Sequence, residues 1–157
     1  MRLNDILQPS NLIAAVTATD KQAVLAELCA HACHYSAVDG FTPEQILSAV
    51  LDRERLGSTG VGQGIAIPHA RLPGLARLTA VYAQSPHGIP FDAIDQEPVT
   101  ILFLLLVPES SSGLHLKALA RIARLLKGDE LRRRLRALRD PAAIYQLLLE
   151  EDNKVGA

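Results

Sequence analysis

The sequence predicts an α/β fold in which a small mixed β-sheet is flanked by helices within a single layered domain. Helical patterns occupy the first third of the chain, apolar runs typical of strands occupy the middle, and helical patterns return in the last third. This order is typical of a sheet covered by helices. A chain of 157 residues can bury one sizeable core. We therefore treat residues 1–157 as one domain and expect residues 152–157 to be a frayed tail.

Two capping patterns mark the starts of the first helices. Residues 19–22 read TDKQ, a capping box led by Thr19, so we expect a helix over residues 20–35. Residues 42–45 read TPEQ, a second capping box with proline at the first helical position, and this helix should run to Arg55. One face of the first helix predicts a core stripe made of Leu25, Leu28, Cys29 and Ala32.

Glycine and proline divide the middle of the chain into a loop and three strands. Residues 57–64 read GSTGVGQG, and four glycines in eight residues predict a loop. Residues 99–107 read VTILFLLLV, which is shorter than the roughly 20 residues of a membrane helix and is typical of a strand buried on both faces. The predicted strands lie at 65–67, 78–83 and 99–107, with a turn at 85–88 and an irregular link at 91–98.

Helical periodicity returns in the last third of the chain. Apolar residues recur at Leu119, Ile122 and Leu125, and the pattern breaks at Gly128. A further start signal is the pair Asp140-Pro141. The predicted helices span residues 116–127, 130–139 and 141–150.

Composition and charge narrow the class of protein. The net charge of -1 does not indicate binding to nucleic acid or to a membrane. Two cysteines, Cys29 and Cys33, are too few for a disulfide scaffold and fit a reducing compartment. No signal peptide is predicted, because the first eight residues are partly polar and no long apolar stretch follows. We expect a cytoplasmic protein.

The segment from Arg55 to His69 combines groups that suit an anion. Arg55 ends a predicted helix directly before the loop, where Gly57, Ser58 and Thr59 offer backbone amides and hydroxyls. Such a concavity can bind an anion without a metal, and a guanidinium suits phosphate oxygens. The loop does not end in Gly-Lys-Ser/Thr, so a Walker-type nucleotide site is disfavoured. Taken alone, a glycine-rich loop is more often only a loop.

Two histidines stand near the ends of predicted strands. His69 follows Pro68, whose restricted backbone can aim the imidazole ring, and neutral imidazole is a competent nucleophile near neutral pH. His115 lies after the buried strand, at the start of the next helix. Strand ends and helix N-termini gather at one edge of an α/β sheet, so the two rings could meet there. Taken alone, a histidine after proline is more often structural than catalytic, and His115 could equally cap or fill the start of its helix.

Residues 53–69, RERLGSTGVGQGIAIPH, resemble the active-site segment of the fructose/mannitol-type EIIA domains of the bacterial phosphotransferase system. Within that family the resemblance is to the nitrogen-regulatory branch, EIIA-Ntr. It continues through FDAID at 91–95, LLLVP at 104–108 and HLKALA at 115–120, and so covers most of the chain. It implies an EIIA type-2-like fold.

The resemblance also implies roles for individual residues. His69 matches the phosphorylated histidine, His115 the second active-site histidine, and Arg55 the arginine near the phosphoryl group. Gly57, Ser58 and Thr59 lie in the matching phosphoryl-binding loop. Ala70 stands where family members commonly have glycine, a small change that does not withdraw the assignment.

The function implied by the resemblance is that of a regulatory phosphotransferase component without cofactor or metal. It would accept a phosphoryl group on His69 from an HPr-like phosphocarrier (NPr). It would then regulate targets such as potassium transport proteins or sensor kinases, with no nucleic acid and no membrane insertion involved. One alternative is a sugar-specific EIIA that passes the phosphoryl group to an EIIB domain. The other is a binding module in which His69 is never phosphorylated.

A cluster of possible metal ligands in the first helix is better explained by packing. Cys29 and Cys33 share a helix face, but His31 points elsewhere, and cysteine in a core stripe behaves as a small apolar residue. We therefore prefer a structural role for this cluster, which also includes His34, to zinc binding.

Two charged features have similar structural explanations. Residues 117–139 hold nine basic residues against two acidic ones, but no aromatic residue interleaves them, so a solvent-facing helix is preferred to a nucleic-acid site. Asp92 and Asp95 could form a carboxylate pair, and local turn capping is the better explanation.

Overall fold

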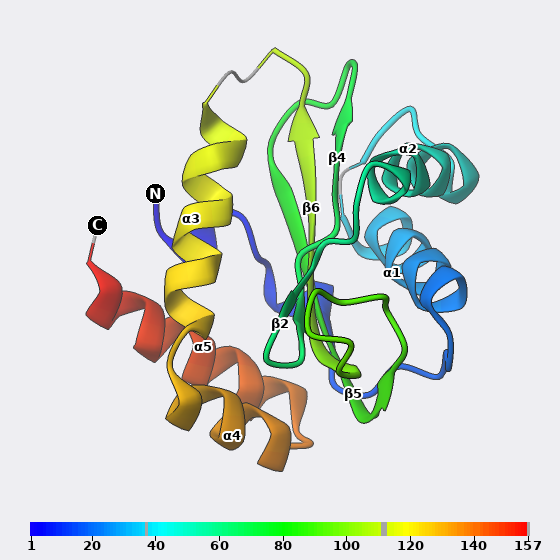
Figure 1. Cartoon of the computed structure of the whole chain (residues 1–157). Helices are drawn as coiled ribbons and strands as arrows, with labels where there is room; N and C mark the ends of the chain where they lie inside the picture. Colours follow the sequence, from blue (N-terminus) through cyan, green and yellow to red (C-terminus); the bar gives the residue numbers. More distant parts are fainter. Residues whose placement is uncertain (37, 111–112, 157) are drawn as a thin grey trace.

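The computed structural model describes residues 1–36, 38–110 and 113–156, and it confirms the predicted α/β fold (Figure 1). Its centre is a six-stranded mixed sheet with the order β1-β5-β6-β3-β2, and β4 also pairs with β6. β5 and β6 are antiparallel, whereas β3 and β4 both run parallel to β6. The strands are β1 (Leu12–Ile13), β2 (Gly60–Gly62), β3 (Ile65–Ala66), β4 (His69–Leu72), β5 (Thr79–Ile89) and β6 (Val99–Pro108).

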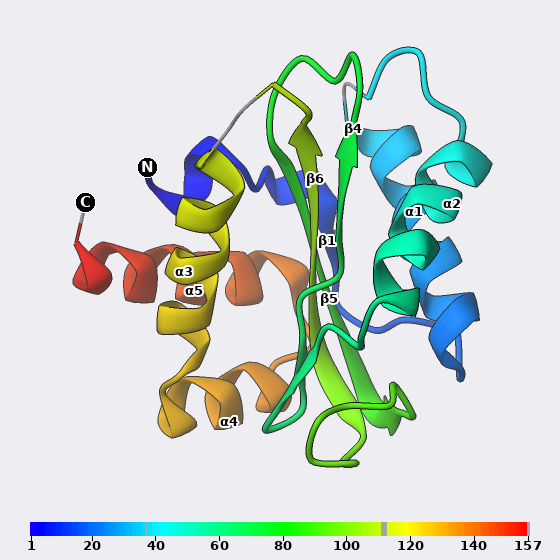
Figure 2. The same ribbon diagram turned by 45° about the horizontal axis from the view of Figure 1, so that its top comes forward.

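Helices cover both faces of the sheet (Figures 1 and 2). On one face lie α1 (Lys21–Tyr35) and α2 (Pro43–Arg55). On the other lie α3 (Leu114–Leu126), α4 (Asp129–Ala137) and α5 (Pro141–Val155), and two short 3-10 helices, Leu3–Asp5 and Pro9–Asn11, precede β1. No helix among the described residues is both long and apolar enough to cross a membrane.

β6 separates two hydrophobic cores. Ile101, Phe103 and Leu105 pack into the cluster that includes α3, α4 and α5 residues. The alternate residues of β6, such as Leu102 and Leu104, pack into the cluster under α1 and α2. Because successive side chains of a strand point to opposite faces, a continuous apolar run suits a strand between two layers. The predicted burial of this strand on both faces is confirmed.

The predicted helix starts are confirmed with one change of capping residue. Thr42 and Gln45 form the reciprocal capping box, with Gln45 N donating to Thr42 Oγ1 at 3.2 Å. At α1 the cap is Asp20 rather than Thr19, and its carboxylate accepts a hydrogen bond from Ala23 N at 2.8 Å. Asp20 caps well because its negative charge also suits the positive end of the helix dipole. The predicted core stripe of α1 is buried.

The middle of the chain contains more strand than the sequence predicted. The glycine-rich loop includes β2, which folds back onto β3, and a side chain at Gly60 would place its Cβ 2.8 Å from Ala93 Cβ. β5 continues through residues 85–88, which were predicted as a turn. It resumes pairing with β6 at Ile89 after an irregular register. The pairs Gln84–Ile101 and Ile89–Val99 flank the segment, so it forms an irregularity within β5 and does not reverse the chain.

The C-terminal helix is longer than predicted. The expectation that the tail is frayed from residue 152 is wrong for residues 152–155, which are helical. α5 continues to Val155, and Asp152 is buried. Its carboxylate accepts hydrogen bonds from Arg121 Nε at 2.7 Å and from Leu3 N at 2.8 Å. A buried charge needs such partners, and this one joins α3, α5 and the N-terminus.

Replacing Asp152 with alanine is expected to lower the free energy of unfolding by about 3–5 kcal/mol, because it leaves the buried Arg121 guanidinium without its carboxylate. Urea denaturation measures this loss. Glu151→Ala is the matched control, since Glu151 pairs with the exposed Arg134 and Lys154 and should cost at most about 1 kcal/mol. Equal losses for the two variants would contradict a structural role for the buried pair.

Candidate functional site

His69 stands where the edge of the sheet changes from β3 to β4. Both strands pair with β6, and the connection between them is also tied to it, because Leu105 N donates to Pro68 O at 2.9 Å. On the other side, Ile67 N donates to Thr59 O at 3.0 Å. The backbone on both sides of Pro68 is therefore fixed, and the half-buried imidazole of His69 projects from a rigid position.

The hydrogen bonds of His69 define its tautomer. Nδ1 lies 3.0 Å from the carbonyl oxygen of Ile67, which can only accept, so Nδ1 carries the proton. Nε2 then carries the lone pair and accepts a hydrogen bond from Arg53 Nε at 3.2 Å. A neutral ring with its lone pair directed outward at Nε2 is the reactive form of a nucleophilic histidine.

Arg53, and not Arg55, is the arginine of α2 that reaches His69. Arg53 also donates from Nη1 to the Gly57 carbonyl at 2.9 Å, which holds its guanidinium in place. Arg55 forms an ion pair with Asp52, and its side chain is 70% exposed. Residues two apart on a helix diverge by about 200°, so only one of the two arginines can face the site. The arginine of α2 beside His69 is therefore Arg53, and the expected place of Arg55 near this histidine is not what the structure shows.

The loop residues predicted to bind a phosphoryl group use their polar atoms within the protein. Ser58 Oγ donates to Phe91 O at 2.8 Å and accepts from Gly60 N at 3.0 Å. Thr59 is buried, and both its amide and its hydroxyl donate to the carboxylate of Glu54. Gly57 N donates to Glu54 O at 3.1 Å. These polar atoms of the loop therefore bond within the protein, and the loop holds Arg53 in place through the Gly57 carbonyl.

Glu54 and Lys21 hold the glycine-rich loop against α1 and α2, and no sequence pattern predicts this role for either residue. Glu54 is buried, with a side chain that is 4% exposed, and its carboxylate pairs with Lys21 Nζ at 2.9 Å. Lys21 Nζ also lies 4.7 Å above the ring centroid of Phe91. These contacts join α1, α2 and the loop. No sequence pattern shows them, because the partners lie up to 70 residues apart, at Lys21 and Phe91.

His115 lies in the first turn of α3, and Arg71 of β4 reaches it. Arg71 Nη2 is 3.2 Å from His115 Nδ1 and 3.0 Å from Nε2. Among the described side chains, no hydrogen bond joins His69 directly to His115. The pKa of His115 is lowered below its ordinary 6.5. Partial removal of water is the largest cause, followed by the Arg71 guanidinium and by the electrostatic effect of His69. The two histidines therefore lie near one edge, as topology predicted, with Arg71 as the link.

Other features from the sequence have structural explanations. Cys29 is buried, and burial raises the pKa of its thiol to about 12. Asp95 accepts hydrogen bonds from Gln63 N at 2.9 Å and Glu97 N at 3.1 Å, which lower the pKa of its carboxyl group. The turn-capping explanation of Asp95 is confirmed. Within the described ranges, no group of three or more metal-ligating side chains is present.

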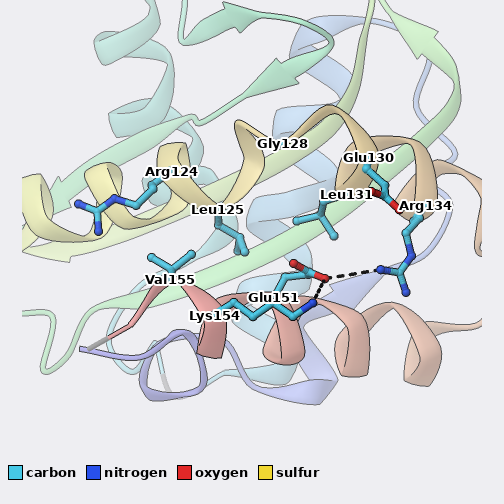
Figure 3. A pocket seen from close by; sticks show the side chains of 9 residues that line it. All are labelled: Arg124, Leu125, Gly128, Glu130, Leu131, Arg134, Glu151, Lys154 and Val155. Atoms are coloured by element: carbon cyan, nitrogen blue, oxygen red, sulfur yellow. Dashed lines mark hydrogen bonds and ion pairs between the residues drawn. The ribbon is translucent and has the colours of Figure 1, made fainter.

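The basic C-terminal segment is partly structural as well. Arg132 is buried and donates to the carbonyls of Leu126 and Lys127 at 2.8 and 2.7 Å, which caps α3. A cavity of about 370 Å³ lies between α3, α4 and α5, and both charged side chains and the apolar Leu125, Leu131 and Val155 line it (Figure 3). Glu151 partly neutralises it by pairing with Arg134 at 3.5 Å and Lys154 at 3.1 Å. We assign no function to this cavity.

Comparisons with known proteins agree with the observed fold of the sheet and helices. Residues 5–151 match the family described as the phosphoenolpyruvate-dependent sugar phosphotransferase system, EIIA 2. The chain is 40% identical over 148 residues to a nitrogen regulatory protein of Bradyrhizobium diazoefficiens, covering 94% of this chain and 95% of that protein.

A sugar-specific relative and a solved structure are also similar. The chain is 38% identical over 104 residues to a fructose-specific EIIA component of Haloferax volcanii, covering 66% of this chain and 68% of that protein. Nitrogen regulatory protein IIA-Ntr from Neisseria meningitidis superimposes with a TM-score of 0.86 at 29% identity, covering 93% of this chain and 98% of that chain.

In an Arg71→Ala variant, the pKa of His115 is expected to rise toward 6.5, because a neighbouring positive charge no longer disfavours the imidazolium form. Just below pH 6.5 the variant ring should therefore be more protonated than the wild-type ring. NMR titration of the histidine ring protons measures both values. Arg133→Ala, which removes an exposed guanidinium from α4, should leave the pKa of His115 unchanged. A wild-type pKa in Arg71→Ala would contradict the coupling.

Proposed function

Because the chain belongs to the EIIA type 2 family of the phosphoenolpyruvate-dependent sugar phosphotransferase system and is an EIIA-Ntr-like phosphocarrier, we propose that His69 Nε2 carries its phosphoryl group. The observation that carries this proposal is the hydrogen bond between His69 Nδ1 and the Ile67 carbonyl at 3.0 Å. It keeps the proton on Nδ1 and leaves the lone pair on Nε2. Nε2 faces the Arg53 guanidinium, where a negatively charged group would be stabilised.

The proposed step exchanges one N–P bond for another. The donor's phosphohistidine enters with a proton on its second ring nitrogen. The Nε2 lone pair of His69 forms the new bond as the donor's N–P bond breaks, and the donor ring leaves as neutral imidazole. His69 keeps its Nδ1 proton, so the product is a phosphorylated imidazolium whose N–H donates to Ile67 O. Bonds of the same kind are broken and formed, so the exchange is close to balanced in free energy.

Positioning and charge account for most of the catalysis in such a transfer. Arg53 must release its hydrogen bond to Nε2 when the lone pair attacks phosphorus. Its guanidinium is then beside the equatorial oxygens, still held by Gly57 O. His115 lies at the start of α3, and because its pKa is lowered, its neutral ring can donate one N–H hydrogen bond to a phosphoryl oxygen.

A regulatory output follows from charge. A phosphoryl group adds about -1.5 to -2 charge to a surface that partners must approach. Four exposed apolar side chains lie in or near the elements that form the site, and they suit docking of a protein partner. They are Leu56, Val61, Ile94 and Leu116. We propose an HPr-like phosphocarrier (NPr) as the donor, and regulated proteins such as potassium transport proteins or sensor kinases as the targets, in the cytoplasm. The similarity to nitrogen regulatory proteins supports this regulatory reading.

The alternative function is a sugar-specific EIIA that passes the phosphoryl group to an EIIB domain. Similarity to a fructose-specific EIIA component favours it, and the chemistry at His69 would be the same. Incubation of phosphorylated protein with a fructose-type EIIB domain distinguishes the two. Fast transfer to EIIB would support the sugar pathway, whereas a stable phosphoprotein that binds regulatory targets differently from the unphosphorylated form would support regulation.

Wild-type protein incubated with a phosphorylated HPr-like carrier is expected to take up one acid-labile phosphoryl group. His69→Ala should take up none, because the nucleophile is absent. His87→Ala, which removes an exposed histidine of β5, is the matched control and should be labelled normally. Intact-mass spectrometry and mapping of the labelled histidine provide the measurement. Absence of label on the wild type from every HPr-like donor tested would instead indicate a binding module that is never phosphorylated.

Arg53→Ala is expected to slow phosphoryl transfer about 100-fold, because it removes a charged donor beside the reacting oxygens. Arg55→Ala is the matched control two residues away and should change the rate by less than about fivefold, since its exposed ion pair with Asp52 contributes little. Rapid-quench measurement of His69 labelling compares the two variants. If Arg55→Ala were the slower of the two, the assignment of Arg53 would be wrong.

A further inference from the structure

Arg71 occupies a position from which it can reach a group on His69. Along β4, His69 and Arg71 lie opposite Leu105 and Val107 of β6, which belong to the core cluster on the α3 side. The intervening Ala70 packs into the cluster under α1 and α2. His69 and Arg71 therefore share the α3 face of the strand, with their Cα atoms about 6.6 Å apart. An extended arginine side chain spans this distance.

The present contact of Arg71 is weak and can be exchanged. Its Nη2 atom lies 3.2 and 3.0 Å from the two ring nitrogens of His115. These nitrogens point away from each other, and a neutral ring has only one lone pair, so one amino group cannot donate well to both. The side chain of Arg71 is also exposed. Within the described part of the chain, no carboxylate lies at ion-pair distance from Arg71.

Arg53 and Arg71 approach the site from different elements. Arg53 comes from α2 and is already held by the Gly57 carbonyl. Arg71 comes from β4 and faces α3. A phosphoryl dianion on Nε2 offers three acceptor oxygens, more than the fork of one guanidinium can satisfy. A second arginine with no carboxylate partner is suited to the remaining oxygens.

Building on the proposed phosphorylation of His69, we propose that Arg71 is a second phosphoryl-binding arginine, which leaves the His115 ring and binds the phosphoryl oxygens when His69 is phosphorylated. Arg53 and Arg71 then hold the group from two sides. The exchange also releases His115 from its cationic neighbour, so phosphorylation of His69 changes the charge environment of the second histidine. Arg71 thereby links the state of His69 to the N-terminus of α3.

The test compares the isolated phosphoproteins of wild type, Arg71→Ala, Arg71→Lys and the control Arg133→Ala by 31P NMR. Removing a cation disfavours the dianion, so Arg71→Ala should raise the pKa of the phosphoryl group by about 1. Arg71→Lys should recover part of this change, and Arg133→Ala should show none. No donor is present in this measurement, so a residue that only contacts the donor would not alter the phosphoryl resonance.

Transfer kinetics give a second readout. Loss of a charged hydrogen bond to the transferring group should lower kcat about tenfold in Arg71→Ala, with little change in KM for the phosphorylated HPr-like donor. An unchanged phosphoryl pKa together with a change confined to KM would overturn the proposal and make Arg71 a donor-docking residue. The role of His69 would stand in that outcome, because wild type is labelled. An unlabelled wild type would overturn both proposals.

Discussion

The double-sided burial of β6 is the constraint on which the rest of the structure depends. Its alternate side chains belong to two different cores, so a slip by one residue would exchange side chains between the cores and disrupt the packing of both. β3 and β4 pair with the same edge of β6, and the Pro68 carbonyl bonds to Leu105 N between them. This rigid edge fixes the backbone at His69, and the neighbouring Ile67 carbonyl then fixes its tautomer.

The site itself places two guanidinium groups around two imidazole rings. Arg53 and Arg71 approach His69 and His115 from α2 and β4. The Arg71 guanidinium disfavours protonation of His115, and the Ile67 carbonyl leaves the lone pair of His69 on Nε2. The same cations favour the dianion that the proposed reaction would place there. Under the proposed function, one set of charges would serve both the unmodified and the phosphorylated protein, and a partner that recognises this surface would meet a different net charge in each state.

Burial of Glu54 connects the α1–α2 layer to this arrangement. A buried carboxylate must be paired, and Lys21 together with the amide and hydroxyl of Thr59 satisfies it. The loop between α2 and β2 is thereby held against α2. Its Gly57 carbonyl holds Arg53 in turn. The glycine-rich loop therefore acts on the site through Arg53 and packing, with its own hydroxyls directed inward.

The sequence by itself determined the fold class, the helix starts and the strand buried on both faces. It also placed one histidine after a strand and one at a helix start. Periodicity, caps and the residues around His69 are local signals, which is why the sequence suffices for these features. Tertiary structure alone decided which arginine of α2 faces His69, that Ser58 and Thr59 bond within the protein, and that Arg71 reaches His115. It also decided that β5 continues through residues 85–88 and that Asp152 is buried against Arg121. These outcomes depend on helix rotation and on partners far apart in the chain, which local patterns do not encode. A helix side chain turns about 100° per residue, so the choice between Arg53 and Arg55 was settled only when α2 packed against the sheet.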